Sequence, residues 1–218
     1  LLGLAISAFC VWIVGRFLVS KSLQKFDIEV TFVGVWSDRK ILTQYSLPSF
    51  LASSIATPVL WVAMAMVART QDGFAQLGIY NAAYQWHGPL VFLPIILMSV
   101  SMPVLVQEWE GGHSHRFRRL FLAMSGIAGA VTLSGSLVLS LISPWIMSLY
   151  GADFSEGWMV LVILLMAAPF HAIAKISTGA LLGMNKAWWV LISNFGWGGT
   201  LLIGTILMIE SLGILGLA

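Results

Sequence analysis

The feature that most constrains the fold is a series of long apolar stretches, each long enough to cross a lipid bilayer. A bilayer core about 30 Å thick needs about 20 apolar residues in a helix. The stretches are residues 1–19, 46–68, 79–105, 120–142, 158–181 and 187–209. A helix satisfies its backbone polar groups internally, whereas a β-barrel would show alternating segments of about ten residues. We therefore predict an all-α, polytopic transmembrane helix bundle with six spans.

The composition excludes a soluble globular domain. Of the 218 residues, 59% are hydrophobic and 9% are charged, whereas a soluble domain carries about 25% charged residues. The 11 Lys and Arg residues form no basic stripe, so we expect no nucleic-acid partner. The single cysteine, Cys10, cannot form a disulfide framework and is expected to be a structural thiol. Because the chain starts at Leu1 without Met and ends in apolar sequence, we expect a piece of a longer protein.

The connections between the predicted spans alternate in charge. One set carries nine basic residues, namely Arg16, Lys21, Lys25, Arg39, Lys40, Arg116, Arg118, Arg119 and Lys186. The other set carries only Arg69, and Lys175 lies within a span. The positive-inside rule places the basic set in the cytoplasm. Six spans fit this alternation with both ends of the chain outside, whereas five or seven would not.

Residues 20–45 differ in composition from the rest of the chain. They mix charged residues with the apolar run Val30–Trp36, which is too short to cross a bilayer. We predict a cytoplasmic linker between two bundles that contains an amphipathic or β-like interfacial piece. An ordinary long loop is the alternative.

Prolines and small residues in the spans indicate bent, closely packed helices. Proline removes one intrahelical hydrogen bond and kinks the helix, a feature common in transporters but also found in static bundles. The internal prolines are Pro58, Pro89, Pro94, Pro103 and Pro169. Small residues recur in 125–136 and 196–200, where they allow close approach of helix backbones.

Two ionisable residues lie inside the fifth predicted span. Such a residue costs about 2.5–3.5 kcal/mol on insertion scales, so its side chain should face protein or water. His171 and Lys175 are four residues apart and therefore share a helix face. We predict that they line a polar cavity, with Lys175 about 6 Å nearer the cytoplasm. The alternatives are that Lys175 extends to the headgroups and that His171 bonds a neighbouring helix.

Further polar residues lie near the ends of the first and third predicted spans. Arg16 is about one turn from the cytoplasmic end of its span, which favours extension toward the headgroups. Asn81, Tyr84, Gln85 and Gly88 fall on one helix face, with His87 at its margin. We interpret this face as a vestibule open to the outside. The alternative is an interfacial belt, since Tyr and Trp favour that depth.

No motif for enzymatic chemistry is present in the sequence. It has no nucleotide-binding GxxxxGK[ST], no metal-ligand cluster and no Ser/His/Asp or Cys/His constellation at a recognisable spacing. No acidic residue lies deep in a predicted span, so no carboxylate-based proton or sodium site is visible. We expect no cofactor, no metal and no catalytic residue, and therefore no enzyme.

Several segments, in this order and spacing, resemble the polysaccharide and oligosaccharide flippases (Wzx-like). That family belongs to the multidrug/oligosaccharidyl-lipid/polysaccharide exporter superfamily. The segments are Tyr45–Ser54, Leu77–Trp86, Phe92–Pro94, Met102–Leu105, Leu149–Phe154 and Gly179–Lys186. Each segment is degenerate alone, and the similarity extends over nearly the whole chain.

The resemblance implies a fragment of a two-lobed transporter of twelve or more helices. Residues 1–19 would be the last helix of the first lobe, 20–45 the inter-lobe linker, and 46–218 a partial second lobe of five helices. The implied activity is movement of a lipid-linked oligosaccharide from the cytoplasmic to the outer leaflet, by alternating access through a cationic lumen. The implied location is the inner (plasma) membrane, with polysaccharide-assembly machinery as a further partner beside the substrate and the bilayer.

The candidate lumen-lining residues rest on our own interpretation of the spans, because the resemblance supplies no binding motif. They are Lys175, His171, Arg16, Asn81, Tyr84 and Gln85. Lys175 and Arg16 would suit an anionic head group, as a point charge and as a fork of donors.

Three alternative functions remain. One is a drug or metabolite exporter of the same superfamily, which an acidic site in the other lobe would favour. Another is a membrane-embedded glycosyltransferase or polymer ligase, which should carry a large outer loop with Arg, His or Asp. The outer connections here are short and nearly uncharged. The third is a membrane scaffold without transport activity.

Overall fold

The computed structural model describes residues 2–25 and 39–217, and every regular element in these ranges is helical. The elements are α1 (Leu2–Lys25), α2 (Arg39–Ile41), the π-helical turn η2 (Leu42–Ser46), α3 (Leu47–Ala68), α4 (Gly73–Tyr84), α5 (His87–Glu110), α6 (Ser114–Leu141), α7 (Ser143–Ser148), the 3₁₀ turn η3 (Ala152–Gly157), α8 (Trp158–Gly183), α9 (Ala187–Leu212) and the 3₁₀ turn η4 (Gly213–Gly216). The chain divides into two compact units, Leu1–Arg39 and Lys40–Ala218, and each is described by itself.

The described part of the first unit contains the long helix α1. The Arg16 guanidinium lies over the Trp12 ring, 5.6 Å from its centroid, and the Trp12 ring in turn stacks with Phe9 at 5.8 Å. The helix continues past residue 19 to Lys25, and so enters the predicted linker. The interfacial piece predicted at 30–36 lies outside the described residues.

Five helical segments of the second unit are long and apolar enough to cross a membrane. They are Arg39–Ala68, Gly73–Glu110, Ser114–Leu141, Ala152–Gly183 and Ala187–Ile209. These segments correspond to the second through sixth predicted spans, so the all-helical, polytopic character is confirmed. Helix α1 is not among the five, and the count of six spans stays a prediction.

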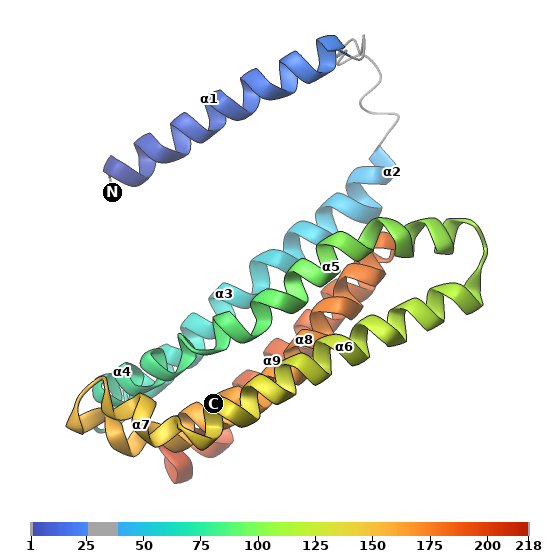
Figure 1. The fold of residues 1–218 in the computed structure, drawn as a ribbon. Helices are drawn as coiled ribbons and strands as arrows, with labels where there is room; N and C mark the ends of the chain where they lie inside the picture. The colour runs from blue at the N-terminus through green and yellow to red at the C-terminus, as the bar shows by residue number, and fades with distance from the viewer. Residues whose placement is uncertain (1, 26–38, 218) are drawn as a thin grey trace. The chain divides into compact units, whose positions relative to one another are not determined.

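Helix α8 lies at the centre of the second unit (Figure 1). It packs closely against α5 and α6 and also contacts α4 and α9, while α3 pairs with α9. Its buried residues recur along one side, at Val160, Leu161, Leu164, Leu165, Ala168, Pro169, Ala172, Ile176 and Ala180. This burial makes α8 the helix against which the other elements of the site are positioned.

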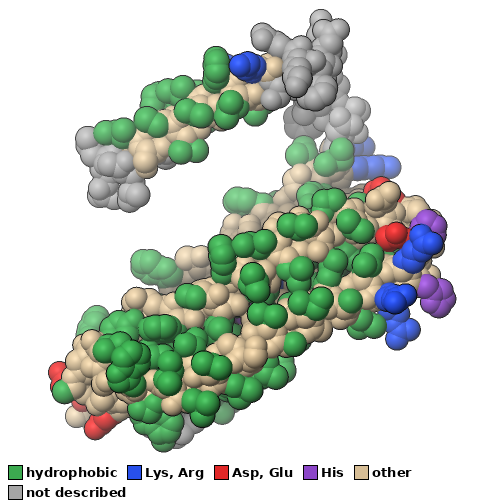
Figure 2. Space-filling model, in the orientation of Figure 1, with side chains coloured by type: hydrophobic (Ala, Val, Ile, Leu, Met, Phe, Trp, Pro, Cys, Tyr) green, Lys and Arg blue, Asp and Glu red, His purple; other side chains and the backbone are tan. Residues whose placement is uncertain are grey.

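Contacts between connections fix the two ends of the bundle. At one end the Lys186 ammonium lies 5.1 Å from the centroid of the Trp109 ring, so the α8–α9 turn adjoins the end of α5. At the other end Trp86 Nε1 donates a hydrogen bond to the Tyr150 hydroxyl at 3.2 Å. Figure 2 shows hydrophobic side chains over the middle of the bundle, with Lys, Arg and His gathered where α5 meets α6. This charge distribution suits a bundle whose two ends face water.

The third predicted span is longer than expected and is interrupted. The sequence predicted one helix over 79–105, but the segment starts at Gly73 and is divided between α4 and α5 by a turn at 85–86. Pro89 accounts for this break. It has no N–H to donate to the Gln85 carbonyl, and its ring crowds that carbonyl. Asn81 and Tyr84 therefore lie on α4, whereas Gln85 lies in the turn and Gly88 on the next helix.

A second proline explains a short polar contact between two helices. Pro169 cannot donate to the carbonyl of Leu165, four residues earlier in α8. The Ser136 hydroxyl of α6 donates to that carbonyl at 2.6 Å, and Ser136 is fully buried. A backbone acceptor freed by proline is thus satisfied by a neighbouring helix, as the interior of a bilayer requires.

Candidate functional site

A row of four rings runs from α4 through α5 to α8. The Tyr80 and Tyr84 rings stack with centroids 5.8 Å apart, and Tyr84 stacks on the His87 imidazole at 5.5 Å. The His87 ring then meets the His171 ring at 5.0 Å, tilted by 45°. Lys175 follows His171 by one helical turn. The row therefore ends in two imidazoles and an ammonium from two different helices.

Local helical geometry determines the positions of most rings in this row. Tyr80 and Tyr84 are four residues apart on α4 and so lie on one face. The turn at 85–86 is short enough that His87, the first residue of α5, remains stacked under Tyr84. Packing of α5 against α8 then places His87 beside His171.

The imidazole pair lies near the middle of α8. His87, the first residue of α5, lies beside His171. His171 comes 13 positions after Trp158, or about 20 Å. Lys175 lies about 6 Å further along α8. These positions place His171 and Lys175 away from the two ends of α8.

The site combines buried and open groups. Tyr80 and His87 are 3% and 7% exposed, whereas Tyr84 is 41% exposed. His171 and Lys175 on α8 are both exposed. An exposed side chain within a span faces either lipid or a water-filled space. Because ionisable groups favour water, His171 and Lys175 should face a water-filled space. The open side of the row is therefore the side from which a polar ligand could approach.

No carboxylate balances the positive charge of the site in the described part of the chain. The acidic side chains described there are Asp72, Glu108, Glu110, Asp153 and Glu156, all in connections or at the ends of spans. Lys175 lies one helical turn from His171, and no ion pair to Lys175 occurs among the described residues. A positive charge without a counter-charge at this depth is costly, which favours an anionic ligand.

The structure brings three of the six predicted lumen residues together. Tyr84, His171 and Lys175 belong to the row or directly adjoin it. Asn81 and Gln85 are exposed near it, and their side chains make no hydrogen bond or ring contact within the described residues. Whether any of these residues lines a lumen stays a prediction.

One predicted residue, Arg16, lies outside the row, and two residues of the row, Tyr80 and His87, were not among the predicted lumen residues. Arg16 belongs to the first unit, where it contacts Trp12. Sequence reasoning left His87 at the margin of the polar face and omitted Tyr80. The spacing of Tyr80, Tyr84 and His87, by four and then three residues, was the signal that could have shown them as one stripe.

The two imidazoles do not form a metal site in the described part of the chain. No group of three or more His, Cys, Asp or Glu side chains that could hold a metal ion occurs there. The neighbouring Lys175 ammonium would also repel a cation. The site's chemistry is therefore that of a cationic and hydrogen-bonding surface.

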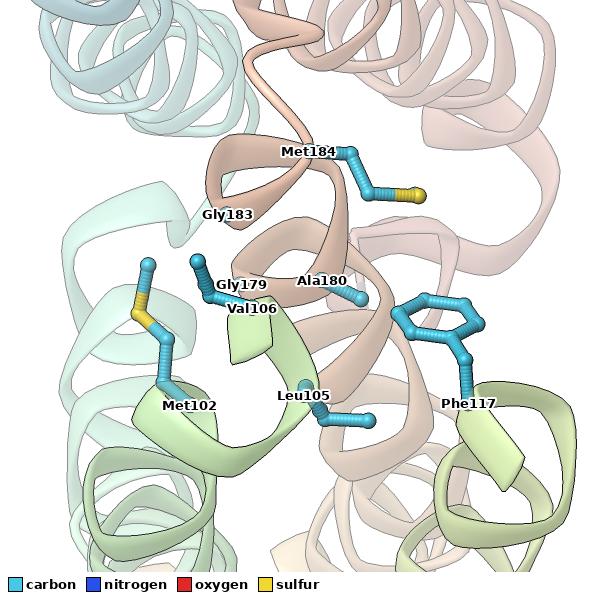
Figure 3. Close-up of a pocket in the computed structure, with 8 residues that line it drawn as sticks. All are labelled: Met102, Leu105, Val106, Phe117, Gly179, Ala180, Gly183 and Met184. Atoms are coloured by element: carbon cyan, nitrogen blue, oxygen red, sulfur yellow. The ribbon is translucent and has the colours of Figure 1, made fainter. Parts of the chain in front are cut away.

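A different environment lies further along α5 and α8. Figure 3 shows apolar side chains and glycines from α5, α6 and α8 around a small hollow, with no charged group among them. They are Met102, Leu105, Val106, Phe117, Gly179, Ala180, Gly183 and Met184. This hollow has no room for a water molecule, so it is a packing feature rather than a ligand site.

Comparison with curated proteins finds two polysaccharide export proteins. The chain is 27% identical over 152 residues to "EPS I polysaccharide export inner membrane protein EpsE" of Ralstonia nicotianae. It is 26% identical over 152 residues to the protein of the same name from Ralstonia solanacearum. Each match covers 68% of this chain and 34% of the relative, so the chain spans about a third of the length of these relatives. No family model and no solved structure matches it significantly.

Proposed function

We propose that the protein moves a lipid-linked oligosaccharide from the cytoplasmic to the outer leaflet, as part of a two-lobed transporter. One support is the similarity to two proteins named for polysaccharide export. The other is a bundle with five helical segments suited to crossing a membrane. A transporter fits these observations better than an enzyme, because the relatives are named as export proteins and the sequence carries no catalytic motif.

The observation that carries the proposal is the cationic group on α8. His171 and Lys175 lie near mid-depth on the central helix, exposed and without a carboxylate partner among the described residues. A lipid-linked oligosaccharide has an anionic phosphate or pyrophosphate group between its sugar and its lipid. A Lys ammonium binds such a group as a point charge. The sugar and phosphate would pass along this face while the lipid tail stays in the membrane.

The remaining predicted residues take roles around this centre. We propose that Tyr84, with Asn81 and Gln85, lies on the outer approach to the site. Helix α4 leads to the imidazole pair, and the positive-inside rule predicts that its start faces outward. Arg16 is proposed as a second cation for the head group, contributed by the first lobe. Alternating access would then expose the same cations first to one side of the membrane and then to the other.

The test is polysaccharide export by the full-length protein carrying changes at Lys175. Lys175→Ala should lower export severalfold at nearly unchanged protein level, because an apolar residue does not hinder membrane insertion. Lys175→Arg should retain more export than Lys175→Ala, since it keeps the charge although its geometry differs. Export is measured as cell-surface polysaccharide, and protein level by immunoblot of the membrane fraction.

The matched control is Lys40→Ala, which removes an exposed lysine before α3. It should export like the wild type. If Lys175 only extends to the headgroups, Lys175→Ala should be as silent as Lys40→Ala. Wild-type export by Lys175→Ala would therefore remove the site on which the proposed function rests.

A further inference from the structure

His87 is an ionisable group of the site to which the proposed function gives no role. We propose that His87 and His171 form, together with Lys175, an anion-binding site that takes up a proton when the anion binds. The ligand is an anionic phosphate or pyrophosphate ester. This inference rests on the proposed function and adds to it a coupling between cargo binding and protonation.

The geometry places the two imidazoles within reach of one ligand. Their centroids are 5.0 Å apart, and they come from different helices, α5 and α8. Lys175 follows His171 by one turn on the exposed side of α8. A protonated imidazole donates from both ring nitrogens and a Lys ammonium donates three hydrogen bonds. Such a set suits the several acceptor oxygens of a phosphate group.

The elements around the pair offer no other charge to balance such a proton. On α4 the facing titratable groups are Tyr80 and Tyr84, and on α8 they are His171 and Lys175. Within the membrane-crossing parts of α3, α6 and α9 there is no charged side chain in 47–68, 120–141 or 187–209. Along α5 the first acidic residue after His87 is Glu108, at the far end of the helix.

The charges make proton and anion binding cooperative. In the empty site, a proton on either imidazole would add a positive charge beside a second imidazole and the Lys175 ammonium, in surroundings of low dielectric constant. A bound anion offsets that repulsion, so the imidazole accepts a proton from water when the anion arrives. By linkage, protonation strengthens anion binding to the same extent that the anion favours protonation. Anion affinity should therefore fall as pH rises through the range in which His titrates.

The competing explanation is that His87 is a packing residue. It is 7% exposed and stacked on Tyr84, and a neutral ring would suffice for that role. In that case the anion would bind through Lys175 alone, and no proton would move with it.

The experiment measures proton uptake during binding of farnesyl pyrophosphate by the full-length protein in a neutral detergent. Calorimetric titrations in two buffers with different heats of ionisation give the number of protons taken up. Affinity is followed from about pH 6 to about pH 8. In wild type we expect net uptake and an affinity that falls by up to about tenfold per pH unit. Farnesol, which lacks the charge, should show neither.

The matched variants distinguish proton uptake by the imidazoles from any contribution of the lysine and from protonation of the ligand itself. His87→Gln/His171→Gln keeps Lys175, so the difference in proton number between wild type and this variant belongs to the imidazoles. His171→Gln alone should lose part of the uptake. Because His171 is exposed, this variant is informative even if replacement of the buried His87 prevents folding. Folding of each variant is checked by thermal melting followed by tryptophan fluorescence.

Three results would overturn the inference. Equal proton numbers in wild type and the histidine variants would show that anion binding moves no imidazole proton. A pH-independent affinity would show the same. Both would leave the proposed function intact if Lys175→Ala abolishes binding and lowers export. Absence of pyrophosphate binding in wild type also refutes the inference, and wild-type export by Lys175→Ala would then refute the proposed site as well.

Discussion

Helices α5 and α8 contact each other at two depths, and the two contacts differ in chemistry. Near the middle of the bundle they bring together two imidazoles, from His87 and His171, beside an exposed lysine. Further along, Met98 and Val106 of α5 pack against glycines of α8. The comparison shows that one helix pair can hold the bundle together at one depth and present unbalanced polar groups at another. We expect stability to depend on the apolar contact and function on the imidazole contact.

The apolar contact is built from a bulky ridge and a small one. Met98 and Met102 lie four residues apart on α5, and Gly179 and Gly183 lie four apart on α8. Figure 3 shows Met102 with the two glycines. A Cβ added at Gly179 would overlap the Met98 side chain, and one at Gly183 would lie 2.7 Å from Val106 Cγ2. Small residues in membrane helices allow this close approach of backbones.

The largest expected effect comes from breaking the apolar contact. Gly179→Leu should destabilise the protein by about 1–3 kcal/mol, because the new side chain cannot fit without displacing Met98 and separating the helices. The measurement is the midpoint of thermal unfolding in detergent, followed by tryptophan fluorescence.

The control for this prediction is Gly196→Leu on α9. A Cβ at Gly196 meets no atom within 4 Å, so this variant adds the same side chain without overlap. Equal melting of both variants would show that the α5–α8 contact is not tightly packed at Gly179.

The sequence predicted the spans well where hydropathy decides them. The stretches 46–68 and 187–209 agree closely with α3 and with the crossing part of α9. Hydropathy indicates which residues can lie in the bilayer, not where the helix begins and ends. This explains the main differences between the predicted spans and the observed helices. Helix α6 starts at Ser114 instead of 120, because its charged first turns are helical although they are too polar for a bilayer.

The site could be predicted only in part. The spacing of His171 and Lys175 is a local signal, and it placed both on one side of α8. The meeting of His171 with His87 is a contact across 84 positions of sequence, and no periodicity within one helix contains it. The interruption at 85–86 also mattered, because a continuous helix from 79 would have given Gln85 and Gly88 a shared face that the turn divides.

The polar contact should show the opposite behaviour from the apolar one. His171→Met should change the free energy of unfolding by no more than about 0.5 kcal/mol, because the side chain is exposed. Export should nevertheless fall severalfold, since a thioether cannot carry a proton or donate to an anion. Thermal melting is measured on the purified variant, and cell-surface polysaccharide on the cells that express it.

Phe170→Met is the matched control, since Phe170 precedes His171 on α8 and is 77% exposed. It should leave both export and melting near wild type. A large loss of stability in His171→Met would assign the imidazole pair to packing, and the contrast between the two depths would disappear.

A third contact of α8 is polar but buried, and it tests whether every polar contact between the helices is needed for function. The Ser136 hydroxyl of α6 donates to the Leu165 carbonyl at 2.6 Å, and that acceptor is free because Pro169 cannot donate to it. This polar group is buried and fully satisfied inside the protein, unlike the cations of the site. We therefore assign it to structure.

The smallest effect is expected for Ser136→Ala. Hydrogen bonds between membrane helices contribute about 0.6 kcal/mol on average, so melting should fall slightly and export should stay at the wild-type level. The effect on the melting midpoint should depend on Pro169.

In a Pro169→Ala background the N–H of residue 169 can donate to the Leu165 carbonyl within α8. Ser136→Ala should then leave the melting midpoint nearly unchanged. A double-mutant cycle on melting measures this coupling. Equal costs in both backgrounds would show that the serine does not replace the hydrogen bond lost to proline. Lower export at unchanged stability would instead extend the functional surface from the α5 side of α8 to its α6 side.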